Sequence, residues 1–119
     1  MDFLKTQLVV VGAGPGGYAA AFYAADLGMK VTLIEREKKL GGVCLNRGCI
    51  PSKALINQAE AFHAIGMLEA MGVKVDSSGL DYSKVQAKSR TAADSSGKGT
   101  ALLMKKNKVE VINGTGLLT

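Results

Sequence analysis

The chain of 119 residues contains no tryptophan, and only 5% of its residues are aromatic. Nucleic-acid binding usually needs a concentrated basic face, with aromatic side chains available for stacking on bases. Here the net charge of +5 is spread along the chain, and the only basic cluster is Lys105, Lys106 and Lys108. A solvated surface explains such a cluster better than a nucleic-acid partner does.

Long apolar runs and a secretory signal are also missing. No run approaches the roughly 20 apolar residues of a membrane span, and the first expected strand begins by about Gln7. Two cysteines in such a chain are typical of a reducing compartment. We therefore expect a cytoplasmic bacterial protein, although a processed organellar chain would show the same pattern. The hydrophobic share of 47% favours a folded chain with room for one domain.

Glycine is abundant, and its first cluster follows an apolar run. Residues 8–11 are Leu-Val-Val-Val, typical of a strand buried in a parallel sheet. Gly12, Gly14 and Gly17 then satisfy the spacing Gly-x-Gly-x-x-Gly. In a dinucleotide-binding fold the first glycine makes the tight turn, the second admits a pyrophosphate and the third lets the helix approach the strand.

An acidic residue completes this pattern. The Ala-rich stretch 18–27 predicts a helix closed by Gly28, and residues 31–34 predict a second strand that ends in Glu35. A carboxylate at this place is suited to accept a hydrogen bond from a ribose 2′-hydroxyl and to repel a 2′-phosphate. The alternative is a glycine turn followed by a surface glutamate. With all elements in register, the sequence predicts an α/β, Rossmann-like nucleotide-binding domain with a parallel sheet.

The two cysteines, Cys44 and Cys49, lie five positions apart. Such a pair suits either a redox-active couple or half of a metal site, but the only other soft ligand is His63, and nothing supplies a fourth. On a straight helix these positions are about 7.5 Å apart along the axis, so a disulfide requires a bend, which Gly48 and Pro51 permit. We favour the redox pair.

Cations lie close to this pair. Arg47 falls between the cysteines, and Lys53 follows Cys49 by one helical turn. Positive charge and a helix N-terminus stabilise thiolates. A constrained bridge in these surroundings should therefore be easily reduced. For Lys53 the alternative is an ordinary solvated helix residue.

The rest of the chain predicts helices and short strands. We expect a helix over 51–70 with Leu55, Ala59, Phe62 and Ile65 on one face, closed by Gly72. His63 on this helix is better explained as a packed or exposed residue than as a catalytic base. The remaining expectations are a short strand over 73–75, a loop over 76–79, a solvent-facing helix over roughly 81–106 with a weak point at 95–100, and a strand over 109–112.

The segment 41–55 reads GGVCLNRGCIPSKAL. It resembles the redox-active segment of the pyridine nucleotide-disulfide oxidoreductases, and among them that of the enzymes that oxidise dihydrolipoamide. Glutathione and mercuric reductases share the Cys-x4-Cys-x-Pro frame, whereas thioredoxin reductase uses Cys-x-x-Cys. The residues around each cysteine look more like the lipoamide enzymes. One departure is Arg47, where the family more often carries valine.

The resemblance implies that electrons pass from dihydrolipoamide through the Cys44–Cys49 disulfide and FAD to NAD+. It implies that Cys44 exchanges with the substrate, that Cys49 faces the flavin as a thiolate, and that Lys53 places a cation near the flavin ring. Gly116 is preferred over Gly114 as a glycine near the flavin's adenine portion. The implied cofactor-binding residues are Gly12, Gly14, Gly17, Glu35, Gly41, Gly42, Lys53 and Gly116.

The resemblance covers only the opening part of the family's longer chain. It implies that residues 1–119 form the N-terminal part of an FAD-binding domain including the disulfide, without the NAD and interface domains, and that they are inactive alone. It also implies a homodimer and a lipoyl-bearing protein of 2-oxo acid dehydrogenase complexes as partners, with neither nucleic acid nor membrane. The alternatives are a related disulfide or mercuric reductase, or a non-catalytic, truncated FAD-binding fragment.

Overall fold

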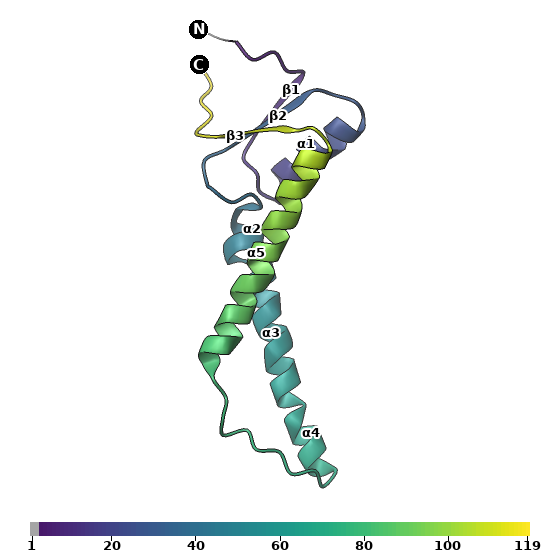
Figure 1. Cartoon of the computed structure of the whole chain (residues 1–119), viewed down its shortest axis with the longest axis vertical. Coiled ribbons are helices and arrows are strands. Elements are labelled where there is room, and N and C mark those ends of the chain that lie inside the picture. The colour runs from purple at the N-terminus through teal and green to yellow at the C-terminus, as the bar shows by residue number, and fades with distance from the viewer. Residues whose placement is uncertain (1–2) are drawn as a thin grey trace.

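The computed structural model describes residues 3–119 and contains a parallel sheet at one end of the molecule (Figure 1). Strands β1 (Leu8–Val11), β2 (Val31–Glu35) and β3 (Glu110–Asn113) lie in the order β1-β2-β3. β2 is the central strand and pairs in parallel with both neighbours. The α/β fold with a parallel sheet is thereby confirmed.

Helix α1 (Pro15–Asp26) connects β1 to β2. It begins three residues before the expected start at Tyr18, because Pro15 is compatible with the first helical position and extends the helix back to Gly14. Gly28 lies just beyond the end with a φ of +88°, as expected of a glycine that closes a helix.

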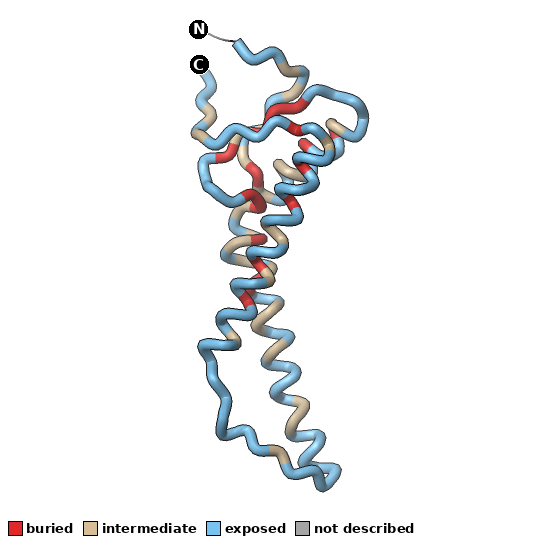
Figure 2. The backbone as a smooth tube through the Cα atoms, viewed as in Figure 1, coloured by how far each residue is buried: buried red, intermediate tan, exposed pale blue. Residues whose placement is uncertain are grey.

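A small core fills the space between the sheet, α1 and the last turns of the longest helix, α5 (Tyr82–Lys106). Figure 2 shows the buried residues concentrated at this end of the molecule. The core residues are Ala13, Ala21, Ala24, Val31, Leu33, Leu40, Met104 and Val109. The small side chains of α1 let the helix lie close to the sheet.

The cysteine segment forms two helices where the sequence predicts one. α2 (Gly42–Arg47) and α3 (Cys49–His63) are separated by Gly48, which has a φ of −130° and a ψ of −109°. The expected bend at Gly48 is confirmed, whereas α2 was not foreseen as a separate helix. A further break at Ala64 precedes α4 (Ile65–Ala70).

Two other expectations are wrong. Residues 73–75 form no strand, because they follow α4 at the end of the molecule farthest from the sheet, where no strand lies beside them (Figure 1). The helix over 81–106 does not face solvent along its length, since Ser89, Ala93, Thr100 and Met104 of α5 are buried, and it runs unbroken through residues 95–100. Gly97 lies beside the carbonyl of Leu40, in the loop before α2, where a Cβ would make an ordinary contact at 3.6 Å.

α3, α4 and the first half of α5 extend away from the sheet as a long arm (Figure 1). The molecule measures 71 × 26 × 20 Å, and its radius of gyration of 20.2 Å exceeds the roughly 13.5 Å of a compact domain of this length. The apolar face predicted for α3 is largely open, since Ala59 and Phe62 are exposed. Within residues 3–119, no helix is long and apolar enough to cross a bilayer.

Candidate functional site

The two glycine segments contact each other at the carboxyl ends of β1 and β2. The backbone N–H of Gly41 donates to the carbonyl of Ala13 over 2.7 Å. A Cβ at Gly42 would lie 2.7 Å from the Cα of Gly14, closer than two non-bonded carbon atoms can approach. Gly41 and Gly42 also have φ values of +108° and +61°, which favour glycine. The start of α2 is therefore held against the turn that follows β1.

The glycines of the first motif divide into two roles. A Cβ at Gly17 would lie 1.8 Å from the carbonyl oxygen of Gly12, so this residue permits the contact between helix and turn that the spacing predicts. Gly12 and Gly14, in contrast, would meet nothing within 4 Å. They border open space at the N-terminus of α1, where backbone N–H groups and the helix dipole favour an anion.

Glu35 ends β2 and its side chain is buried. One carboxylate oxygen accepts from the N–H of Ala13 at 2.6 Å, and the other accepts from the N–H of Glu37 at 2.9 Å. Burial raises the pKa of the Glu35 carboxyl, but the backbone donors of Glu37, Ala13 and Arg36 outweigh it, so the pKa lies below its usual 4.5. The residue is thus an ionised acceptor at the edge of the glycine turn, not a surface glutamate.

Because its folded-state pKa is lowered, ionised Glu35 stabilises the fold above about pH 4.5, and this contribution is lost as the pH falls through the folded-state pKa. We expect Glu35→Gln to lower the free energy of unfolding at pH 7. The difference from the unmodified protein should shrink on acidification. Urea unfolding at a series of pH values measures it, with the exposed Glu60→Gln as control. A difference that is constant with pH would contradict the assignment.

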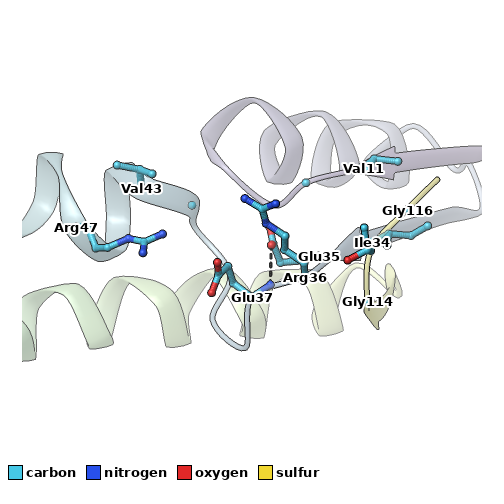
Figure 3. Close-up of a pocket in the computed structure, with 12 residues that line it drawn as sticks. Val11, Ile34, Glu35, Arg36, Glu37, Val43, Arg47, Gly114 and Gly116 are labelled. Carbon is cyan, nitrogen blue, oxygen red and sulfur yellow. Dashed lines mark hydrogen bonds between the residues drawn. The ribbon is translucent and has the colours of Figure 1, made fainter. Parts of the chain in front are cut away.

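A cavity of about 380 Å³ lies between these elements (Figure 3). Of the residues predicted to bind a cofactor, Gly12, Glu35, Gly42 and Gly116 line it. Gly114 lines it as well, so the preference for Gly116 over Gly114 stays a prediction. The other lining residues are Val11, Ile34, Arg36, Glu37, Val43, Arg47 and Thr115. Of these the sequence singled out only Arg47, as a cation beside the cysteines and not as a cofactor contact.

The cysteines lie beside this cavity and not in its wall. Cys44 and Cys49 form a disulfide that joins α2 to the start of α3, with their Cα atoms 4.6 Å apart. Cys44 is half-buried and Cys49 is exposed. Lys53 is exposed on α3, and it makes no hydrogen bond or ion pair to another side chain within residues 3–119. The break at Gly48 is what brings the two cysteines within reach of each other.

A hydrogen-bond network that the sequence did not reveal holds α2 in place. The side-chain amide of Asn46 donates to the carbonyls of Leu40 and Gly42, at 3.1 and 2.9 Å. The carbonyl of Asn46 accepts from the guanidinium of Arg90, on α5, at 3.0 Å. These contacts fix the helix that carries Cys44 both to the loop before it and to α5. No local sequence signal links two residues 44 positions apart.

Comparison with known proteins agrees with this geometry. A sequence model of the pyridine nucleotide-disulphide oxidoreductases matches residues 6–119. The chain belongs to this family.

Curated relatives of this oxidoreductase chain include three dihydrolipoyl dehydrogenases. The protein of Zymomonas mobilis is 49% identical over 113 residues, that of Geobacillus stearothermophilus 47% over 114, and that of Chlorobaculum tepidum 46% over 120. These matches cover 95%, 95% and 99% of the chain, but only 24%, 24% and 25% of the relatives. The chain thus spans about a quarter of the length of the curated relatives it matches.

The residues of this pyridine nucleotide-disulphide oxidoreductase fit a flavin dinucleotide. The cavity falls within the usual size range of ligand sites. Its wall combines the ionised carboxylate of Glu35, a group of the kind that accepts from a ribose hydroxyl, with open space at Gly12. The contact between Gly42 and Gly14 places the helix of Cys44 at the same edge. These features suit the adenosine diphosphate half of FAD.

Proposed function

We propose that this chain belongs to a flavoprotein that oxidises dihydrolipoamide to lipoamide, with electrons passing through the Cys44–Cys49 disulfide and FAD to NAD+. The main support is the position of the disulfide. It bridges α2 and α3, and α2 begins at Gly42, which lines the nucleotide cavity. A redox pair is therefore rigidly connected to a site suited to a dinucleotide. The names of the curated relatives favour dihydrolipoamide as the substrate.

The proposed reaction begins as thiol-disulfide exchange. A thiolate of dihydrolipoamide attacks Sγ of Cys44, the bond to Cys49 breaks, and Cys49 leaves as a thiolate. The second substrate thiol then attacks the mixed disulfide, which releases lipoamide and returns Cys44 as a thiol. The substrate has lost two electrons and two protons. The cysteine pair has gained the two electrons and one proton, as the Cys44 thiol and the Cys49 thiolate, and the proton lost when the attacking thiol ionised goes to solvent. Bound FAD supplies the means to pass these two electrons on to NAD+.

The residues of the chain are suited to different parts of this reaction. Cys49 is the first residue of α3, a helix of 15 residues, whose N-terminal dipole favours a thiolate at that position. We assign it the flavin-facing role, and Cys44 the exchange with substrate. Lys53 follows by one turn and would stabilise negative charge developing on the flavin. Glu35 and the glycines at 12, 14, 17, 41, 42 and 116 would hold FAD.

The wider setting of the reaction is also proposed. Residues 1–119 would form the first part of an FAD-binding domain in a cytoplasmic homodimer, with NAD+ bound elsewhere. The partner would be a lipoyl-bearing protein of a 2-oxo acid dehydrogenase complex. This setting is consistent with relatives about four times as long as the chain.

The test is an assay of the whole protein. We expect a flavin absorbance band and NADH formation with dihydrolipoamide and NAD+, because the dithiol is the matched donor for the cysteine pair. Residues 1–119 expressed alone should form no NADH, since a site for NAD+ is needed as well. Glutathione disulfide and mercuric ion, each with NADPH, serve as competing substrates. Faster turnover of either would reassign the protein to another reductase, and a protein without flavin would leave it a non-catalytic member.

A further inference from the structure

Two arginines line the nucleotide cavity from different elements. Arg36 follows Glu35 in the loop after β2, and Arg47 is the last residue of α2. Both are exposed, and neither forms an ion pair within residues 3–119. A neighbouring cavity of about 520 Å³ is lined by the same two arginines together with Gly42 and Glu37. The arginines therefore stand where the two cavities adjoin.

Figure 3 shows how their side chains lie. The guanidinium of Arg47 projects from α2 toward the loop, that of Arg36 rises from the loop, and Glu37 lies between the two. Arg47 is one helical turn beyond Val43, and both line the cavity. Positive charge thus borders the cavity from two sides, from the end of α2 and from the loop after β2.

The residues that line this cavity indicate which part of a ligand lies beside the arginines. Gly12 and Gly42 border the N-terminus of α1, and Glu35, which would bind a ribose hydroxyl, lies next to the same turn because its carboxylate accepts from the N–H of Ala13. In a dinucleotide the phosphates lie next to the ribose, on the side toward the helix N-terminus. Guanidinium groups bind phosphate through directed, charge-assisted hydrogen bonds.

We propose that Arg47, assisted by Arg36, binds the diphosphate of the flavin dinucleotide and so determines affinity for the cofactor. This inference rests on the proposed function. It differs from the expectation that Arg47 chiefly stabilises the cysteine thiolates, because Arg47 lines the cavity while neither cysteine does. Glu37 has the opposite effect, since its carboxylate competes with the phosphates for the same guanidinium groups.

The experiment measures binding of FAD, ADP and adenosine to the flavin-free whole protein by calorimetry. Arg47→Met should weaken FAD and ADP about tenfold, the scale of one charge-assisted contact. Adenosine, which has no phosphate, should be unaffected. Arg47→Lys should retain part of the affinity, and Glu37→Gln should raise it. The matched control is Lys88→Met, an exposed cation on α5 that lines neither cavity.

The possible results of these binding measurements separate the roles that Arg47 could have. Equal losses for adenosine and ADP would show that Arg47 contacts the base or sugar, and would overturn the proposal. An unchanged affinity with a shifted reduction potential of the cysteine pair would instead assign Arg47 to the disulfide. Failure of the unmodified protein to bind FAD at all would refute the proposed function itself. Loss of ADP affinity in Arg47→Met, with adenosine and the Lys88→Met control unchanged, supports the proposal.

Discussion

Replacing Gly17 with alanine should lower the free energy of unfolding by roughly 3 kcal/mol or more. The added Cβ would lie 1.8 Å from the carbonyl oxygen of Gly12 and 2.9 Å from its carbonyl carbon. Both are backbone atoms, so no side chain can rotate to relieve the contact. The turn after β1 and the start of α1 would have to separate, and the nucleotide cavity that Gly12 lines would be distorted.

The matched control for Gly17→Ala lies one residue earlier. A Cβ at Gly16 would meet nothing within 4 Å, and Gly16 is not among the glycines with a positive φ. Gly16→Ala should therefore leave the free energy of unfolding nearly unchanged, or raise it by about 0.5 kcal/mol by restricting the unfolded chain. Urea denaturation of the two variants measures the difference. An equal change in the two variants would show that the contact with Gly12 does not govern the stability effect at residue 17.

The glycine turn and the position of Glu35 could be predicted from the sequence because the rules for both are local. The spacing of Gly12, Gly14 and Gly17 specifies one turn between a strand and a helix, and the next strand ends in the acid. The structure brings Glu35 within 2.6 Å of the backbone of Ala13, across 22 positions of chain. The turn, the start of the helix and the end of the strand each depend on residues that are adjacent in the sequence. The glycine and acid pattern was therefore enough to predict how they are arranged.

The contacts made by α5 could not be predicted in this way. Gly97 reads as a helix-weakening residue when only its neighbours are considered. In the structure it lies beside the carbonyl of Leu40, 57 positions earlier, and the helix is unbroken. Arg90 likewise reaches Asn46 from a distant element. Helix propensity and periodicity contain no information about which loop will lie against a given face.

The pattern of apolar residues was likewise not enough to predict which residues are buried or paired. The periodicity of α3 correctly indicates a helix, but it predicts a buried face where Phe62 is 45% exposed. Residues 73–75 have the composition of a strand, yet a strand needs a neighbour to pair with, and none lies there. For a related reason Arg36 and Glu37 were missed, and Arg47 was noted only for its place between the cysteines. As charged residues they resemble any solvated surface until the fold places them around one cavity.

Either cysteine replacement should lower turnover of dihydrolipoamide by roughly 10³-fold or more, because the exchange needs both sulfurs of the bridge. The structure pairs Cys44 with Cys49 and gives neither another cysteine partner within residues 3–119. Steady-state assays of Cys44→Ser and Cys49→Ser in the whole protein measure this loss. Ser95→Ala is a suitable control, since Ser95 is exposed on α5, which carries neither cysteine. A cysteine variant that retains turnover would exclude the disulfide from the reaction.

The two cysteine variants should nevertheless differ in their spectra, because only one sulfur is proposed to face the flavin. In Cys44→Ser, the remaining Cys49 thiolate can donate charge to oxidised FAD and produce a long-wavelength absorbance shoulder, which Cys49→Ser should lack. The N-terminus of α3 and Lys53 favour that thiolate, so acid should bleach the shoulder with a midpoint below the roughly 8.5 of a free thiol. A shoulder found only in Cys49→Ser would reverse the two roles, and its absence from both variants would mean that neither sulfur lies against the flavin.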